Sequence, residues 1–175
     1  MERALVIGGS GMLAETCHWL EKQGYEVYVV GRTRSKMAKL LENSQNILPL
    51  YTDYRDVNDF KQKINQTFDW SLVVAWIHNV PENPMKVLLD VLFNQKSTCD
   101  FYHVLGSSSN LNTIKEKLKT PKNCTYHQVQ LGFILETGYS RWLTNQEISK
   151  GVIEAFKLKQ PTYIVGQLEP WDQRP

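Results

Sequence analysis

No stretch of this 175-residue sequence is apolar for long enough to cross a lipid bilayer. The longest apolar run, Leu72 to Ile77, is far shorter than the ~20 residues that a transmembrane helix needs. The N-terminus reaches Gly8 after a short apolar run, which is too brief for the core of a secretory signal. We therefore expect a soluble, cytoplasmic protein with no membrane partner.

Cysteine is also scarce, and no two cysteines form a C-x-x-C pair. The odd number of cysteines, Cys17, Cys99 and Cys124, and their apolar surroundings favour reduced thiols in the core over a disulfide framework or a zinc site. A reactive thiol is the alternative. His18 and His103 fall on a predicted helix and a predicted strand, and no spacing of His, Cys or carboxylates indicates a metal site.

Neither sign of charge dominates, since 20 Lys and Arg residues are balanced by 18 Asp and Glu residues. These charges are scattered rather than clustered, so the sequence lacks the basic stripe that binds a polyanion, and we expect no nucleic-acid partner. With 42% hydrophobic residues, the chain has enough apolar material for one core. Its length and the lack of a linker predict one domain over residues 1–175.

Short apolar segments alternate along the chain with segments of helical period. This alternation predicts an α/β protein with a doubly wound parallel sheet and helices on both faces, a three-layer α/β/α arrangement. The predicted strands are Ala4–Ile7, Glu26–Val30, Asn46–Tyr51, Ser71–Trp76, Phe101–Leu105, Tyr126–Gln130 and Thr162–Val165.

The segments between the strands carry helix signals. Apolar residues recur at helical spacing at Val57, Phe60 and Ile64, which gives one face to bury on the sheet. Thr144 and Glu147 form a capping-box pattern at the start of the last predicted helix. The stretch 85–93 is apolar on more than one face, so we expect it to lie deep in the core or against a second copy of the chain.

The first predicted strand runs directly into a glycine-rich turn. Gly9 to Ala14 match the pattern G-x-G-x-x-A between a predicted strand and a predicted helix. Because glycines have no side chain, a phosphate can approach the backbone amides at the helix N-terminus, where the helix dipole favours negative charge. We expect the dinucleotide pyrophosphate to contact Gly8, Gly9, Ser10, Gly11, Met12 and Leu13. The alternative is a tight turn that binds nothing.

The end of the second predicted strand indicates which dinucleotide is preferred. An acidic residue at this place would hold the ribose 2′-hydroxyl of NAD, but the chain has Arg32, Thr33 and Arg34. Guanidinium groups bind a 2′-phosphate through paired, charge-assisted hydrogen bonds. The sequence therefore favours NADP(H) over NAD(H). The alternative is that both arginines are solvated residues at the start of the next helix.

Polar or bulky residues also follow the third and fourth predicted strands. Asp53 and Tyr54 stand where the adenosine would lie, although Asp53 could instead cap the following helix. Ala75, Trp76 and Ile77 end the fourth strand at the carboxyl edge, where ligands bind in open α/β sheets. We expect these residues to border the cofactor as well.

These residues resemble the short-chain dehydrogenase/reductase superfamily, in particular its small atypical members. The likeness spans most of the chain, through the segments VIGGSGMLA, VVGRTR, Asp53-Tyr54, VVAWIHN, HVLGSSS and QLGFILE. It implies a Rossmann sheet with strand order 3-2-1-4-5-6-7 and hydride transfer between NADP(H) and a carbonyl or alcohol. It also implies that Gly132, Phe133 and Ile134 offer backbone groups to the nicotinamide, and that the helix over 85–93 forms a dimer.

The chain departs from this family at the catalytic pair. The family uses a Tyr as general acid/base with a Lys four residues later, and no tyrosine of this chain is followed in that way. The family's Ser has a counterpart at Ser107 or Ser108. His78 and Tyr139 are further candidates to replace the missing acid, because both are expected near the carboxyl edge of the sheet.

The sequence thus leads to two hypotheses from different classes. The first is an NADP(H)-dependent oxidoreductase that acts on a small carbonyl substrate. The second is a non-catalytic NADP(H)-binding module that senses the cofactor or regulates a partner, which the missing Tyr and Lys favour. A Rossmann domain that binds no nucleotide would require both the glycine turn and the two arginines to be coincidental.

Overall fold

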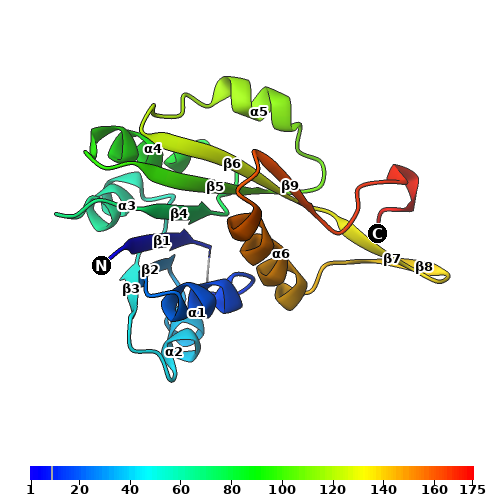
Figure 1. The fold of residues 1–175 in the computed structure, drawn as a ribbon, viewed down its shortest axis with the longest axis horizontal. Coiled ribbons are helices and arrows are strands. Elements are labelled where there is room, and N and C mark those ends of the chain that lie inside the picture. The colour runs from blue at the N-terminus through cyan, green and yellow to red at the C-terminus, as the bar shows by residue number, and fades with distance from the viewer. Residues whose placement is uncertain (9) are drawn as a thin grey trace.

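Seven parallel strands form the central sheet, in the order β3-β2-β1-β4-β5-β6-β9 (Figure 1). The computed structural model of the chain describes residues 1–8 and 10–175. The strands of the sheet are Arg3–Ile7 (β1), Glu26–Gly31 (β2), Ile47–Tyr51 (β3), Leu72–Ala75 (β4), Cys99–Leu105 (β5), Cys124–Leu131 (β6) and Thr162–Val165 (β9). The predicted doubly wound fold and the predicted strand order are confirmed, with β9 as the seventh strand of the sheet.

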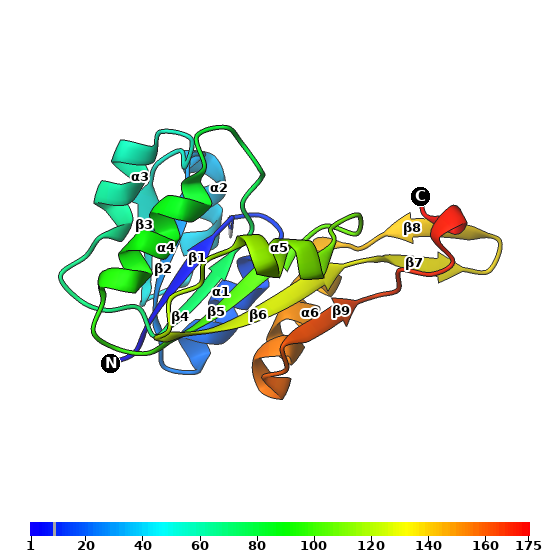
Figure 2. The same ribbon diagram turned by 90° about the horizontal axis from the view of Figure 1, so that it is seen from above.

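Helices cover both faces of this sheet, as Figures 1 and 2 show. The helices are Ala14–Lys22 (α1), Arg34–Leu41 (α2), Val57–Ile64 (α3), Pro84–Asn94 (α4), Leu111–Lys117 (α5) and Asn145–Leu158 (α6). Buried side chains of α1, α2 and α6 share one hydrophobic cluster, whereas those of α3 and α4 belong to a second cluster on the opposite face. The α/β/α layering therefore follows the predicted alternation of apolar strands and amphipathic helices.

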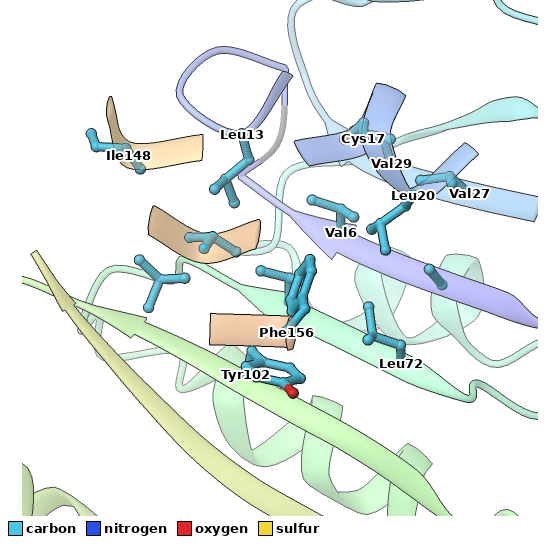
Figure 3. Packing of buried hydrophobic residues seen from close by; sticks show 14 of the residues in the cluster. Val6, Leu13, Cys17, Leu20, Val27, Val29, Leu72, Tyr102, Ile148 and Phe156 are labelled. Atoms are coloured by element: carbon cyan, nitrogen blue, oxygen red, sulfur yellow. The ribbon is translucent and has the colours of Figure 1, made fainter. Parts of the chain in front are cut away.

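The larger cluster joins α1 and α6 to the sheet (Figure 3). Phe156 of α6 packs edge-on against Tyr102 of β5, with ring centroids 4.7 Å apart. At the other end of α6, the predicted capping box is present: the Glu147 amide donates to Thr144 Oγ1 at 3.1 Å, and Glu147 Oε1 accepts from the Thr144 amide at 2.9 Å. The cap fixes where α6 begins, and the apolar face fixes how it lies.

A two-stranded hairpin, β7 (Phe133–Glu136) and β8 (Tyr139–Trp142), extends from the body of the protein (Figure 2). The sequence predicts no strand here. The turn carries Gly138 at φ +87°, a conformation that favours glycine. The hairpin is tied to the C-terminal segment, because Phe133 and Gln167 exchange two backbone hydrogen bonds of 2.9 Å.

Helix α4 spans the stretch that was predicted to be buried on more than one face. Its side chains at Leu88, Leu89 and Leu92 are buried against the sheet and α3, whereas Phe93 is 69% exposed. Self-association through this helix stays a prediction. Within residues 1–8 and 10–175, none of the helices combines the length and the hydropathy that crossing a membrane would require.

Gly151 is the point where α6 comes closest to the sheet. A Cβ at this position would overlap the side chain of Val165 on β9, whose own Cβ would lie only 2.9 Å away. We therefore expect Gly151→Ala to lower the free energy of unfolding by ~1–3 kcal/mol, as overpacked cores do. Urea denaturation followed by far-UV circular dichroism measures this change.

A Gly→Ala substitution inside a helix ordinarily raises the free energy of unfolding by up to ~1 kcal/mol. A decrease at Gly151 therefore indicates the close contact with Val165. Lys150→Ala, at the exposed neighbouring position, is the matched control and should change stability by less than ~0.5 kcal/mol. A Gly151→Ala protein as stable as the wild type would contradict the close contact between α6 and β9.

Candidate functional site

The ends of β1 and β4 enclose a crevice at the carboxyl edge of the sheet. These two strands are neighbours, but the chain continues from β1 into α1 on one face and from β4 toward α4 on the other, which is where open α/β sheets bind ligands. A cavity of about 610 Å³ opens there. Of the predicted cofactor residues, Gly8, Ser10, Gly11, Met12, Arg32, Thr33, Asp53, Tyr54 and Trp76 line it.

The two glycines of the turn that the structure describes, Gly8 and Gly11, lack a side chain for different reasons. Gly8 has φ +85°, and a Cβ there would lie 2.9 Å from the carbonyl oxygen of Trp76, so folding itself requires glycine. At Gly11 the backbone is not in the left-handed region, and a Cβ would meet nothing within 4 Å in the described chain. Packing therefore does not require glycine at Gly11, and the space in front of it is open. Gly9 lies outside the described residues.

Helix α6 holds the glycine turn in place. Ser149 Oγ donates to the carbonyl oxygen of Met12 at 2.8 Å and accepts from the amide of Thr16 at 3.3 Å. Thr16 Oγ1 in turn donates to the carbonyl oxygen of Ser149 at 3.4 Å. The side chain of Leu13 is fully buried in the core, so of this residue only the backbone is left for the crevice. Sequence reasoning missed Ser149, for which the only signal was a small polar residue on the buried face of α6.

The N-cap residue of α1, Leu13, makes no side-chain hydrogen bond to the helix. Of the first three amides of the helix, that of Ala14 donates to the carbonyl oxygen of Gly11 at 3.2 Å and that of Thr16 donates to Ser149 Oγ, whereas the Glu15 amide has no partner within the described chain. The first amides of a helix have no partner within the helix, and the helix dipole adds partial positive charge at this end. Because Gly11 is open and the Glu15 amide has no partner within the described chain, the turn is suited to an anionic group.

Three cationic residues border the same cavity, namely Arg32, Lys36 and Arg55. Asp53 lies among them: its carboxylate accepts from the amide of Arg55 at 3.0 Å and forms ion pairs of 3.3 Å with Arg32 and 3.5 Å with Arg55. The Arg55 amide, followed by the two guanidinium groups, holds the pKa of Asp53 below its usual value. Sequence reasoning missed Lys36 and Arg55, although both closely follow predicted site residues.

The structure separates the two predicted arginines. Arg32 borders the cavity, whereas the guanidinium of Arg34 lies 4.0 Å from the ring centroid of Tyr51 on β3 and does not line the cavity. Such stacking is a favourable cation–π contact. In this arrangement Arg32, Lys36 and Arg55 supply the positive charge of the crevice.

The chain after β3 reaches the cavity through Thr52 and Tyr54. Thr52 is 6% exposed, and its Oγ1 has no hydrogen-bond partner within the described chain. Tyr54 accepts from the amide of His78 at 3.1 Å and so connects the loops after β3 and β4. The alternative that Asp53 caps the next helix is wrong, because Asp56 is the N-cap of α3 and its carboxylate accepts from the Asp59 amide at 3.2 Å.

The side chain of Trp76 crosses the carboxyl edge of the sheet. Its Cδ1 would lie 3.3 Å from a Cβ at Gly8, and its Cη2 4.0 Å from a Cβ at Gly106, which follows β5. Beyond it a second cavity, of about 570 Å³, lies toward α4 and α5. Trp76, His78 and Val80 line both cavities and form the wall between them.

The remaining predicted residues are distributed as follows. Ile77, His78 and Ser108 line the second cavity, Ala75 is fully buried, and Ser107 lines neither cavity. Gly132, Phe133 and Ile134 line neither cavity and lie where the hairpin meets the C-terminal segment. Tyr139 is 61% exposed on β8 and borders a separate hollow at the hairpin. The structure therefore brings together His78 and Ser108, but not Ser107 or Tyr139.

One buried histidine, His103 on β5, lines the second cavity. It is 4% exposed, and its Nδ1 lies 2.7 Å from the hydroxyl of Tyr126 on β6. Burial lowers the pKa of His103 from 6.5 to about 4, so its imidazole is neutral near pH 7. The sequence predicts only that His103 lies on a strand, because its hydrogen-bond partner is set by the pairing of β5 with β6.

The lowered pKa of His103 predicts a loss of stability on mild acidification. The unfolded chain takes up a proton near pH 6.5, whereas the folded chain does so only near pH 4. Between pH 6.5 and pH 5 we expect His103 to reduce the free energy of unfolding by about 2 kcal/mol. Urea denaturation across this range, in the wild type and in His103→Phe, should show a smaller loss in the variant. Equal slopes would contradict the neutral imidazole.

Comparison with known proteins gives a likeness in structure but not in sequence. No protein-family model matches this sequence, and no curated protein sequence matches it. A short-chain dehydrogenase from Burkholderia cenocepacia in complex with NADP superposes with a TM-score of 0.69 and 14% identity, over 96% of this chain and 91% of that one.

Two further solved structures are also similar to this chain in fold and not in sequence. A short-chain dehydrogenase/reductase family protein gives a TM-score of 0.73 with 13% identity, over 95% of this chain and 97% of that one. An alcohol dehydrogenase from Comamonas testosteroni, specific for bulky-bulky ketones, superposes with a TM-score of 0.70 and 13% identity, over 98% of this chain and 90% of that one. The chain therefore has the Rossmann fold of the short-chain dehydrogenases/reductases, and its resemblance to that family holds in three dimensions.

Proposed function

We propose that this protein binds NADP(H) in the cavity between the ends of β1 and β4 and transfers hydride between it and a small carbonyl or alcohol. The observation that carries the proposal is Gly11. Its lack of a side chain serves no packing contact with the described chain, it follows a strand of the central sheet, and it precedes a helix whose N-cap residue, Leu13, makes no side-chain hydrogen bond. A glycine that the fold does not need, at a helix N-terminus, is accounted for by a phosphate that approaches the backbone.

The other residues of the cavity fit the same ligand. In the proposed complex, the amides at the start of α1 hold the pyrophosphate, and Arg32 with Lys36 and Arg55 faces the phosphorylated adenosine. The buried Thr52 hydroxyl, which lacks a partner in the described chain, gains one from the adenosine half. The cavity of about 610 Å³ is within the ~300–1,000 Å³ range of ligand sites. When bound, NADPH supplies the hydride.

Preference for NADP(H) over NAD(H) rests on the charges after β2. Arg32 pairs with Asp53 at 3.3 Å, and its side chain is 62% exposed, so its remaining donors are accessible to a 2′-phosphate. Asp53 is partly neutralised by Arg55, which limits its repulsion of the phosphate. An NAD-type site would instead place a carboxylate at the end of β2.

The rival function is a non-catalytic NADP(H)-binding module. One structural observation favours it: α5, the helix that follows the Ser107 to Ser109 segment, spans only Leu111–Lys117 and has no buried residue. It carries no tyrosine, so the usual acid of the resembled family has no counterpart on it. Oxidation of NADPH across a panel of small carbonyl compounds separates the two functions. A reductase consumes NADPH with some of them, whereas a sensor binds NADPH without turnover.

Substitution of Gly11 tests the site without disturbing the fold. Because a Cβ at this position meets nothing within 4 Å, we expect Gly11→Ala to leave the melting temperature within about 2 °C of the wild type. The methyl group occupies the space in front of the helix amides, so NADPH binding should weaken at least ~tenfold. Titration followed by quenching of tryptophan fluorescence measures the affinity. Gly24→Ala, remote from the cavity, should leave the affinity unchanged, although φ of +96° at Gly24 makes this substitution strained and lowers the melting temperature.

Unchanged NADPH affinity in Gly11→Ala would remove the leading proposal. Loss of affinity together with a large fall in melting temperature would show that Gly11 serves the fold after all.

Arg32→Ala tests the choice of dinucleotide. We expect this variant to bind NADPH ~tenfold or more weakly, because a charge-assisted hydrogen bond to the 2′-phosphate is lost, and to bind NADH with little change. Arg34→Ala is the matched control, since its guanidinium lies on Tyr51 and outside the cavity, and it should alter neither affinity. Equal losses for NADPH and NADH in Arg32→Ala would argue against recognition of the 2′-phosphate.

A further inference from the structure

Two of the three cysteines of the chain lie directly opposite each other in the central sheet. Cys99 is the first residue of β5 and Cys124 the first residue of β6, and the two are partners in the register of these parallel strands. Both belong to the hydrophobic cluster on the face that α3 and α4 cover, so their side chains point the same way. Neighbouring strands lie ~4.7–4.9 Å apart, within the ~4.4–6.8 Å between Cα atoms that a disulfide requires.

The two thiols differ in burial and in acidity. Cys99 is 3% exposed, whereas Cys124 is only partly buried and keeps some contact with solvent. The hydrogen bond that the two thiols share, more than any other contact, raises the pKa of Cys99 and lowers the pKa of Cys124, although burial and the Asp100 carboxylate oppose ionisation of Cys124. Cys99 therefore keeps its proton as the donor, and Cys124 is the thiol of the pair that ionises.

The third cysteine provides an internal comparison. Cys17 is fully buried on α1, in the cluster on the opposite face of the sheet, so the sheet separates it from the other two cysteines. Burial raises the pKa of Cys17 to about 12. Because the thiolate is the reactive form of cysteine, we expect Cys17 to be inert in the folded protein.

We propose that Cys99 and Cys124 form a redox-modification site, which small disulfides oxidise to an intramolecular disulfide between β5 and β6. The Cys124 thiolate attacks one sulfur of the reagent, so a mixed disulfide forms and one thiolate leaves. The Cys99 sulfur then attacks Cys124 Sγ, its proton passes to the departing group, and the second thiol leaves. Two protein thiols are thereby oxidised, and one reagent disulfide is reduced to two thiols. None of these steps involves the dinucleotide.

The fold already holds the two strand starts together, since the amide of Cys99 donates to the carbonyl oxygen of Asn123 at 2.9 Å. The disulfide would close the chain between residues 99 and 124 into a ring. This ring contains α5, a helix without buried residues, and the segment after β5 that borders the second cavity. A cross-link restricts the unfolded chain, so we expect oxidation to raise the urea midpoint of unfolding.

The first test is the stoichiometry of oxidation. Hydroxyethyl disulfide is the probe, because it is uncharged and the Asp100 carboxylate does not repel it, and the folded full chain is exposed to it at pH 7. We expect the wild type to lose two of its three free thiols and to retain no adduct of the reagent. Peptide mapping should find Cys99 joined to Cys124, and dithiothreitol should restore both thiols. Cys17→Ser is the matched control and should form the same disulfide at the wild-type rate.

The order of attack is tested with single substitutions. Cys99→Ser should stop at a stable mixed disulfide on Cys124, because the thiol that completes the reaction is missing. Cys124→Ser should react at least ~tenfold more slowly, because the remaining thiol of the pair is buried and protonated. Far-UV circular dichroism checks that each variant is folded.

The pH dependence of alkylation tests whether Cys99 acts on Cys124 as a positioning residue. The rate at which iodoacetamide modifies Cys124, measured by mass spectrometry of its peptide, follows the thiolate fraction. We expect the midpoint of this profile to move to higher pH in Cys99→Ala, which removes the donor. Cys99→Ser, which retains a hydroxyl donor, should restore part of the shift.

Several results would overturn the proposal: three free thiols in the oxidised wild type, stable adducts in place of an internal disulfide, or a disulfide that includes Cys17. A lower urea midpoint in the oxidised protein would do the same, because the bond would then not fit the folded register. If Cys124→Ser reacts as fast as Cys99→Ser, or if the alkylation midpoint is the same in the wild type and Cys99→Ala, the assignment of Cys124 as the attacking thiol is wrong.

Discussion

The contact between Gly8 and the backbone of Trp76 constrains everything that lies at the carboxyl edge of the sheet. Only a residue without a side chain fits between the ends of β1 and β4 at this point, and φ of +85° at Gly8 directs the chain away from the strand toward α1. Because β4 leads to the opposite face, the two strands part and leave the crevice open. The positions of the helix amides, the cations and both cavities all follow from this junction.

Residues far apart in sequence complete the site. Ser149, near the start of α6, bonds the carbonyl oxygen of Met12 and the amide of Thr16, so the last helix stabilises the first turn of the protein. The positive charge comes from the segments after β2 and β3, where Asp53 holds Arg32 and Arg55 on one carboxylate. An anion that enters the crevice meets groups already positioned by the fold, which lowers the entropy cost of binding.

Much of this arrangement follows from local sequence patterns. Apolar runs predicted all seven strands of the main sheet, and the G-x-G-x-x-A pattern predicted the turn after β1. The capping-box pattern at Thr144 and Glu147 predicted the start of α6. The hairpin β7–β8 was missed because β8, with the sequence YSRW, is largely exposed and has no apolar run to mark it. The stacking of Arg34 on Tyr51, the bond from Ser149 to Met12 and the bond of His103 to Tyr126 depend on how separate elements pack or pair. No local pattern encodes such contacts.

The indole of Trp76 belongs to the wall of both cavities, which gives the molecule a property that neither cavity has alone. If an occupant of one cavity shifts this ring, the volume open in the other cavity changes as well, and the two occupancies are then energetically linked. Such linkage is reciprocal by thermodynamic necessity: whatever one ligand does to the affinity for the second, the second does equally to the affinity for the first. One side chain thus stands in the lining of both the crevice and the second cavity.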